Sequence, residues 1–179
     1  MPEHRKFFID KMKTPLGDAT LIADGDGAMR MYCWEEDAHD WRKLFLRRYG
    51  KCELVARIDR FGHVAALKRY FDGDISALDT IPVAFVGTPF QIMVWNALRT
   101  IAGGTTLSYG ALAQRIGKPK AVRAVGLANA SNPVGVVVPC HRVIGGDGSL
   151  TGYRGGLARK RWLLEHEARN CDLRLEISK

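Results

Sequence analysis

The feature of the sequence that most limits its folding is a run of β-branched residues that ends at a proline. Four valines fall between positions 134 and 138, and such a run predicts a short, buried strand. Pro139 ends the run, because proline cannot continue the hydrogen-bonded ladder of a sheet. Cys140 and His141 follow directly, so a thiol and an imidazole are expected side by side on a constrained turn.

A thiol beside an imidazole is typical of nucleophilic catalysis, since the thiolate is the attacking species and a neighbouring base can produce it. Adjacency alone leaves a second interpretation open, in which Cys140 is a small core residue and His141 has only a structural contact. The setting favours chemistry, because the pair lies between a rigid element and the Gly145-Gly146 turn.

Charge is distributed unevenly along the chain. Residues 1–85 hold 14 Lys and Arg against 14 Asp and Glu, whereas residues 86–179 hold 13 against 5, so the second half carries the whole net charge of +8. A basic half beside a neutral half predicts a polyanionic partner such as nucleic acid. A solvated basic surface without a partner is the alternative.

Composition argues against several classes of protein. With 179 residues, 46% of them hydrophobic and 26% charged, the chain is expected to be globular, as one domain or two small ones. No apolar run is long enough to span a membrane and the N-terminus has no signal-peptide core, so we expect a cytoplasmic protein without a membrane partner. The four cysteines are scattered and no histidine has metal-ligand spacing, so we expect no metal and no cofactor.

Residues 1–75 predict a small α+β domain, which a linker over 76–87 joins to the rest of the chain. An Asp-Gly-Asp-Gly sequence at 24–27 indicates a β-hairpin turn. No pattern in this half points to chemistry. The expected elements are hairpin strands over 6–34, helices over 38–49 and 63–71, and a further strand over 52–58.

Residues 88–170 predict a second, mainly helical domain, followed by a polar tail over 171–179. Its first helix has three start signals in Thr88-Pro89-Phe90-Gln91: an N-cap, a proline at the first position and a capping box. Two short helices joined by a tight turn then form a helix-turn-helix pattern. The expected helices after the first cover 108–117, 120–130 and 157–168.

The second helix of the helix-turn-helix pattern places small residues around a single arginine. Ala121, Ala124 and Gly126 let a backbone approach a nucleic-acid groove closely, and Arg123 is long enough to reach into it. A plain alanine-rich packing helix is the alternative, because helix-turn-helix shapes are common in proteins that never bind DNA.

The stretch Pro139-Cys140-His141-Arg142-Val143 resembles the active-site motif of the O6-alkylguanine-DNA alkyltransferases, the methylated-DNA–protein-cysteine methyltransferases. The resemblance covers essentially the whole chain, is densest from Thr88 to Glu167 and favours the bacterial, single-unit form. It implies an α+β fold with a small ribonuclease-H-like N-terminal domain and a winged-helix C-terminal domain. Further matching segments are Thr14-Pro15-Leu16-Gly17, Trp34-Glu35-Glu36, Thr88-Pro89-Phe90-Gln91, Ser108-Tyr109-Gly110, Ala124-Val125-Gly126, Ser131-Asn132-Pro133, Thr151-Gly152-Tyr153 and Trp162-Leu163-Leu164.

The resemblance implies DNA repair by direct reversal of alkylation damage. O6-alkylguanine, and also O4-alkylthymine, would be flipped out of double-stranded DNA, and its alkyl group would move irreversibly to Cys140 in a single turnover. His141 would take the thiol proton through a water molecule, and Glu167 would orient His141. Asn132 would be the hinge between the recognition helix and the active-site loop.

The resemblance also implies how DNA and the damaged base are held. Arg123 would enter the base stack from a helix in the minor groove, and the protein would be a monomer, with clustering on DNA as a further expectation. Gly135 and Arg154 depart from many relatives, so the size of alkyl group accepted stays open. The substrate pocket would be lined by Tyr109, Val143, Tyr153, Arg154 and Gly155, and DNA would be contacted by Arg123, Lys120, Ala121, Ala124 and Gly126.

Two other functions would account for part of the sequence. A non-enzymatic protein that binds damaged DNA could use the same fold, but relatives of that kind lack the reactive cysteine that Cys140 provides. A cysteine hydrolase would account for Cys140, His141 and Glu167. It would leave the basic half and the helix-turn-helix pattern unexplained.

The basic half predicts that DNA binding weakens steeply with rising salt, because protein cations replace the counterions on DNA phosphates. Arg123→Ala is expected to reduce alkyl transfer strongly while changing the slope of log affinity against log salt by roughly one phosphate contact or less. DNA-binding titrations over a range of salt concentrations, beside transfer assays, measure both effects. An affinity that did not change with salt would contradict the electrostatic interpretation.

Overall fold

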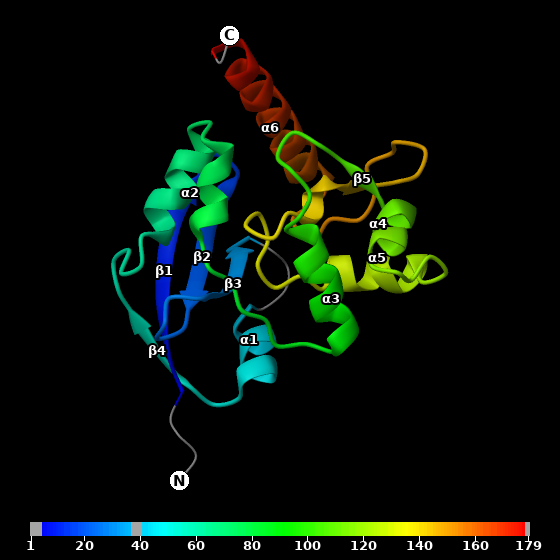
Figure 1. Cartoon of the computed structure of the whole chain (residues 1–179). Coiled ribbons are helices and arrows are strands. Elements are labelled where there is room, and N and C mark those ends of the chain that lie inside the picture. The colour runs from blue at the N-terminus through cyan, green and yellow to red at the C-terminus, as the bar shows by residue number, and fades with distance from the viewer. Residues whose placement is uncertain (1–4, 37–40, 178–179) are drawn as a thin grey trace.

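The computed structural model describes residues 5–36 and 41–177, with side chains as far as Cys171. Figure 1 shows a sheet at one side of the molecule and a group of helices at the other, so the expected mixed α+β class is confirmed. The elements in chain order are β1 (Lys6–Thr14), β2 (Gly17–Ala23), β3 (Met29–Trp34), α1 (Trp41–Tyr49), β4 (Glu53–Ala56), α2 (His63–Phe71), the 3-10 helix η1 (Ile75–Thr80), α3 (Pro89–Leu98), β5 (Leu107–Ser108), α4 (Tyr109–Arg115), α5 (Val122–Ala130), the 3-10 helix η2 (Cys140–Arg142), β6 (Val143–Ile144) and α6 (Leu157–Ile177).

The N-terminal sheet has the strand order β3-β2-β1-β4, in which β4 runs parallel to β1 and the other neighbours are antiparallel. The hairpin between β2 and β3 forms as predicted. Asp24 Oδ1 accepts hydrogen bonds from the backbone N–H groups of Asp26 and Ala28, which closes the turn. Strand β3 is one of the two edge strands of the sheet, and its Tyr32 forms an isolated bridge with Val134 in the second half of the chain.

The segment over residues 76–87, predicted as a linker, is packed against the sheet. Helix η1 covers its beginning, Leu78 and Ile81 are buried, and Val83 forms a bridge with Met29. The main hydrophobic cluster takes residues from the sheet, from this segment and from helices α3 to α6. One continuous core thus holds the two halves of the molecule together.

Two helices of the second half, α3 and α4, begin at residues whose side chains cap them. Thr88 Oγ1 accepts a hydrogen bond from the N–H of Gln91 at 3.2 Å, and the Gln91 side chain accepts one from the N–H of Thr88 at 3.0 Å. Ser108 caps α4 through the N–H of Ala111 at 3.0 Å. Helices α4 and α5 form the predicted helix-turn-helix pair, next to the short parallel ladder of β5 and β6.

The strand predicted for the valine run is wrong. Val134 makes one bridge to β3, and the chain then turns, with a hydrogen bond from the N–H of Val138 to the carbonyl of Val134 at 2.9 Å. The valines are buried as expected, but Val136 has φ of 65° and interrupts any extended backbone. The β-branched side chains therefore reflect burial in the core and not pairing in a sheet.

Helix α6 also differs from the prediction, which ended it at residue 168 and placed a tail over 171–179. Within the described residues the helix continues to Ile177. Its last residues include Leu173, Arg174 and Glu176, which are good helix formers, and no glycine or proline interrupts them. The end of the apolar periodicity therefore does not by itself mark the end of a helix; a helix-breaking residue is also needed.

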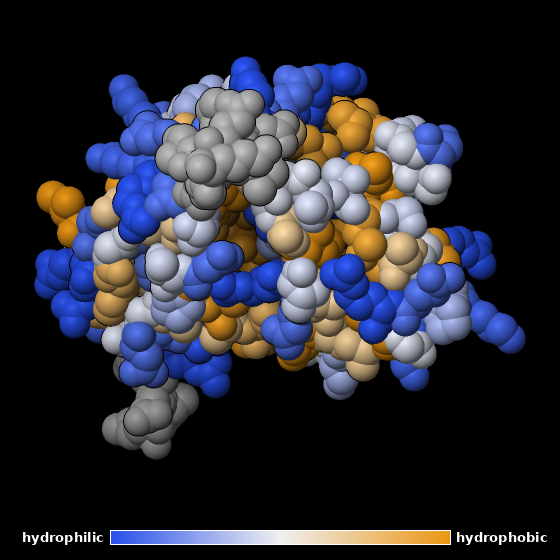
Figure 2. Space-filling view, turned by 45° about the horizontal axis from the view of Figure 1, so that its top comes forward, coloured by the Kyte–Doolittle hydropathy of each residue, from blue (hydrophilic) through white to orange (hydrophobic). Residues whose placement is uncertain are grey.

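Hydrophobic residues reach the surface in the face that Figure 2 shows, where they lie between hydrophilic residues and form no single broad area. Ile58, before α2, is 99% exposed, and Leu127, on α5, is 74% exposed. Within residues 5–36 and 41–177, no helix is both long and apolar enough to cross a lipid bilayer.

The capping box at the start of α3 generates a stability prediction. Thr88→Ala is expected to lower the free energy of unfolding by about 1 kcal/mol, because it leaves the N–H of Gln91 without its acceptor. Urea denaturation measures this change. Thr151→Ala, an exposed threonine whose side chain makes no hydrogen bond in the described structure, is the control and should be nearly neutral. Equal losses in both variants would contradict the capping argument.

Candidate active site

The loop that leads to the thiol is shaped by a buried asparagine at the end of α5. Asn132 Oδ1 accepts a hydrogen bond from the N–H of Val134 at 3.0 Å, and its Nδ2 donates to the carbonyl of Val138 at 2.8 Å. Because one side chain binds both ends of the turn, the backbone reaches Pro139 in a fixed direction. Helix η2 then begins and presents Cys140.

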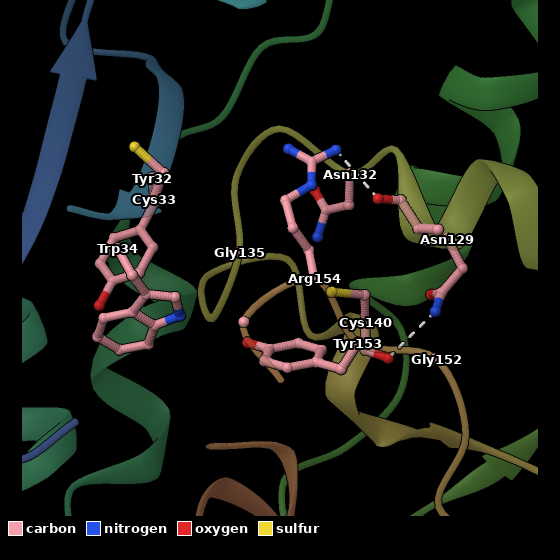
Figure 3. Close-up of a pocket in the computed structure, with 12 residues that line it drawn as sticks. Tyr32, Cys33, Trp34, Asn129, Asn132, Gly135, Cys140, Gly152, Tyr153 and Arg154 are labelled. Carbon is pink, nitrogen blue, oxygen red and sulfur yellow. Dashed lines mark hydrogen bonds between the residues drawn. The ribbon is translucent and has the colours of Figure 1, made fainter. Parts of the chain in front are cut away.

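The side chain of Cys140 lies at a small pocket between the two halves of the molecule and is 7% exposed. Figure 3 shows Tyr153 and Arg154 beside the sulfur, with Tyr32 and Trp34 of β3 on the other side of the pocket. The cavity has a volume of about 30 Å³. Such a volume holds water but not a purine base.

One wall of the pocket depends on close packing between a glycine and an indole ring. A Cβ placed on Gly155 would lie 2.7 Å from Nε1 of Trp34, which is far inside van der Waals contact. Glycine at this position therefore lets the loop over residues 152–156 pack directly against β3. The edge strand of the N-terminal sheet thus helps to shape the pocket of a cysteine in the second half.

Beneath the pocket, His141 and Glu167 are paired and fully buried. The distance between His141 Nε2 and Glu167 Oε1 is 2.9 Å. An ionised carboxylate only accepts hydrogen bonds, so the imidazole carries its proton on Nε2 and keeps the lone pair on Nδ1. Within the described part of the chain, Nδ1 forms no hydrogen bond, and it is the ring atom available to accept a proton.

The Glu167 carboxylate also receives hydrogen bonds from an arginine and a tyrosine. Arg142 donates through Nε to Oε2 at 2.8 Å and through Nη2 to Oε1 at 2.9 Å, while the hydroxyl of Tyr70 donates to Oε1 at 2.9 Å. Tyr70 lies on α2, so both halves of the chain hold this carboxylate. A buried charge with this many donors and a cationic partner is fully compensated.

The electrostatics of the site keep the thiol protonated until a base acts on it. Burial by itself raises the pKa of the Glu167 carboxyl, but His141 and Arg142 hold that pKa well below its ordinary value. Burial lowers the pKa of His141, so the imidazole is neutral at physiological pH. Burial raises the pKa of Cys140 by more than Asn132 and nearby cations lower it. The site therefore combines a neutral thiol with a neutral base.

A buried lysine holds the strand after the cysteine against the pocket loop. The Nζ of Lys160 donates to the carbonyl of Val143 at 2.6 Å and to the carbonyl of Thr151 at 2.7 Å. Burial lowers the pKa of this amine, and the neighbouring Cys140 counteracts that effect. Lys160 is therefore both a tether for the pocket loop and a cation close to the sulfur.

The remaining predicted residues lie beside the pocket or on the surface of α5. The hydroxyl of Tyr109 donates to the carbonyl of Thr151 at 3.4 Å, at the edge of the pocket. Lys120, Arg123 and Ala124 are exposed. Five of the predicted residues thus line one pocket: Cys140, Asn132, Tyr153, Arg154 and Gly155. His141 is paired with Glu167 beneath the pocket, and Val143 is buried in β6. Ala121, just before α5, and Gly126, on α5, are partly buried.

Several residues of the site were not identified from the sequence. Arg142 belongs to the cysteine motif, but the motif does not predict its contact with Glu167. Lys160 had a detectable signal, because residues 160, 163 and 167 share one face of a helix. Tyr70, which lies 97 residues before Glu167, and the pocket wall from β3 had no sequence signal.

The fold and the site together define a class of protein. A thiol in a pocket is backed by a neutral imidazole and a buried carboxylate, and the same half carries a helix-turn-helix and the net positive charge. These features together indicate a protein that uses a cysteine nucleophile on a nucleic-acid substrate.

Comparison with known proteins identifies the family. Residues 89–169 match the family model described as the DNA-binding domain of 6-O-methylguanine DNA methyltransferase. A methylated-DNA–protein-cysteine methyltransferase of Shigella flexneri is 47% identical over 160 residues, which cover 88% of this chain and 94% of that protein. The protein of that name from Haemophilus influenzae is 51% identical over 155 residues, or 86% of this chain and 82% of that protein. The chain belongs to the methylated-DNA–protein-cysteine methyltransferase family.

Solved structures show the same relationship. The crystal structure of the Mycobacterium tuberculosis O6-methylguanine methyltransferase superimposes with a TM-score of 0.77 at 38% identity, covering 92% of this chain and 94% of that one. A structure of the Mycobacterium tuberculosis protein in complex with DNA gives a TM-score of 0.75 at 38% identity, with the same coverage.

The buried Glu167 network generates a prediction with a defined pH dependence. Glu167→Gln is expected to lower the free energy of unfolding by about 3–5 kcal/mol at neutral pH, because Arg142 loses its charged partner. The carboxyl has a lower pKa when folded, so its contribution is fully present above the ordinary value of 4.5 and is lost progressively as the pH falls from there toward the lower pKa of the folded state.

The difference between the parent and Glu167→Gln in urea denaturation should therefore shrink between about pH 5 and pH 3. Glu165→Gln, which removes an exposed carboxylate from the same helix, is the matched control and should be nearly neutral. A difference that stayed constant with pH would contradict an ionised Glu167.

Proposed function

We propose that this protein repairs double-stranded DNA by moving the alkyl group of O6-alkylguanine irreversibly to the sulfur of Cys140, once per chain. O4-alkylthymine is a second substrate of the same chemistry. The observation that carries the proposal is the pocket thiol above an imidazole whose Nδ1 is free to accept a proton. That site lies on the half of the chain that matches a methyltransferase DNA-binding domain.

The raised pKa of Cys140 requires a base for the transfer. The thiol gives its proton, through a water molecule, to Nδ1 of His141, and Glu167 orients the ring and stabilises the imidazolium. The sulfur then attacks the alkyl carbon, so that an S–C bond forms and the C–O6 bond breaks. The electron pair of the broken bond moves to the guanine, which takes up one proton, equivalent to the one that the thiol gave to His141, and is restored as a neutral base.

Residues around the pocket support this reaction in different ways. Tyr109, whose hydroxyl lies at the pocket edge, donates a hydrogen bond to the flipped base. Lys160 is close enough to Cys140 to favour the thiolate as it forms. Asn132 keeps the cysteine loop in register with α5, through hydrogen bonds at both ends of the turn. Tyr153 and the backbone of Gly155 contribute the walls against which the base stacks.

DNA is bound through α5 and the positive charge of the second half. We assign this half to the winged-helix class and the N-terminal sheet to the ribonuclease-H-like class, and the α4–α5 pair beside β5 and β6 supports the first assignment. The exposed Arg123 enters the base stack, and small residues at 121, 124 and 126 let the helix approach the minor groove. The protein acts as a monomer, since one chain supplies the thiol, the base and the helix.

Mass spectrometry tests the proposed function. After incubation with duplex DNA that contains O6-methylguanine, the peptide with Cys140 is expected to gain the mass of one CH₂ group, and the reaction is expected to stop at one equivalent. Cys140→Ala should abolish transfer but bind DNA nearly as well as the parent, because the side chain is buried.

Cys52→Ser is the matched control for thiol specificity, because Cys52 lies outside the pocket in the N-terminal half and should not alter transfer. An alkyl group found on another cysteine would refute the assignment of Cys140. DNA binding without any transfer would indicate a non-enzymatic lesion-binding protein, and repeated turnover on an ester or amide would indicate a hydrolase.

A further inference from the structure

The side chain of Arg154 lines the pocket that contains Cys140 and runs toward the end of α5. It begins on the loop over residues 152–156, and its Nη2 donates a hydrogen bond to the carbonyl of Ala130, at the end of α5, at 3.0 Å. Figure 3 shows the guanidinium beside Asn132 and the first part of the Arg154 side chain near the sulfur of Cys140, with a dashed line marking this bond. The arginine thus joins two of the segments that line the pocket.

The pocket is too small for the reaction proposed above, so part of its lining has to move when a base enters. The cavity of about 30 Å³ accommodates water only. Asn132 is held by two hydrogen bonds to backbone, and Trp34 is buried against Gly155. Arg154 is exposed, and within the described residues its side chain makes one hydrogen bond. It is less restrained than either Asn132 or Trp34.

A second arginine at the same helix end shows why Arg154 is easily released. Arg48 of α1 donates to the carbonyl of Ser131 at 2.9 Å and to that of Val86 at 3.4 Å, and its guanidinium lies 5.2 Å from the ring centroid of Trp95. Two cations therefore share the negative end of α5, where each repels the other. Arg48 has several contacts and stays in place, so the repulsion favours departure of Arg154.

We propose that Arg154 is a specificity-determining residue that restricts alkyl transfer to bases carried by DNA. Bonded to Ala130, it closes the pocket to a free alkylguanine. A DNA phosphate can replace that carbonyl, because a charged, bidentate acceptor binds guanidinium more strongly than one neutral oxygen does. The guanidinium then leaves the pocket as DNA binds, and the flipped base takes its space. This inference rests on the proposed function for the identity of the substrate.

The test compares two substrates that carry the same reactive group, duplex DNA with O6-methylguanine and O6-methylguanine as the free base. The rate of methylation of Cys140 is measured by mass spectrometry for the parent and for Arg154→Ala. The variant is expected to react about fivefold faster with the free base, the change that loss of one ordinary hydrogen bond produces. With limiting DNA it should react more slowly than the parent, because the phosphate contact is lost.

Two further variants make the result decisive. Arg154→Met keeps much of the length of the side chain but cannot bond to Ala130, so it should also react faster with the free base. If Arg154→Ala reacted faster with the free base and Arg154→Met did not, the size of the side chain and not its hydrogen bond would close the pocket, and the proposal would be overturned. Arg161→Ala removes an exposed cation from α6, away from the pocket lining, and should leave the ratio of the two rates unchanged.

An unchanged or lower free-base rate in Arg154→Ala would also overturn the proposal. That outcome is separate from failure of the proposed function, which would appear as absence of methylation of the parent by duplex DNA. Thermal unfolding of each variant confirms that the exposed substitutions leave the fold intact.

Discussion

The carboxylate of Glu167 lies fully buried where the two halves of the chain meet, and the candidate active site depends on how it is compensated. Arg142 neutralises it with two hydrogen bonds, Tyr70 supplies a third from the N-terminal half, and His141 a fourth. An uncompensated charge in this position would be strongly destabilising. Because the compensation is complete, the carboxylate remains ionised and sets the tautomer of His141, which leaves Nδ1 as the ring atom with a free lone pair.

The same network explains why a buried cysteine can react without being a permanent thiolate. Burial in this pocket makes the charged thiolate unfavourable in free energy, and this desolvation raises the pKa of Cys140. In the proposed reaction, the neutral imidazole of His141 takes the proton when an alkyl group is in reach of the sulfur. The thiol is thereby protected from other electrophiles and oxidants, which react with thiolates. This protection suits a protein whose one reaction uses up its nucleophile.

Local signals in the sequence predicted much of the fold, and the misses have physical reasons. The hairpin at Asp24, the capping box at Thr88 and the helix-turn-helix pair depend on neighbours in sequence, and they formed as expected. The valine run was misassigned because burial and strand pairing favour the same residue types, and only the hydrogen bonds of Asn132 distinguish them. The end of α6 was misplaced because no helix-breaking residue marks it.

For the site, the motif around Cys140 and the helical position of Glu167 could be read from the sequence together with the family resemblance. The contributions of Tyr70 and Trp34 could not be, because they depend on tertiary packing between segments about a hundred residues apart. The size of the pocket and the position of the Arg154 side chain belong to the same category. Both follow from how the loop over residues 152–156 rests on α5 and β3.

The contact between Gly155 and Trp34 constrains how this family can diversify. A methyl group at position 155 would collide with the indole of Trp34 and with the ring of Tyr153, so a larger residue there requires a smaller side chain at position 34 and a shift of the ring at position 153. Positions 34 and 155, on opposite halves of the molecule, should therefore change in pairs over evolutionary time. If recombination replaced the N-terminal sheet with one that carried a different residue at position 34, the pocket wall at position 155 would shift, even if every residue of the cysteine motif stayed the same.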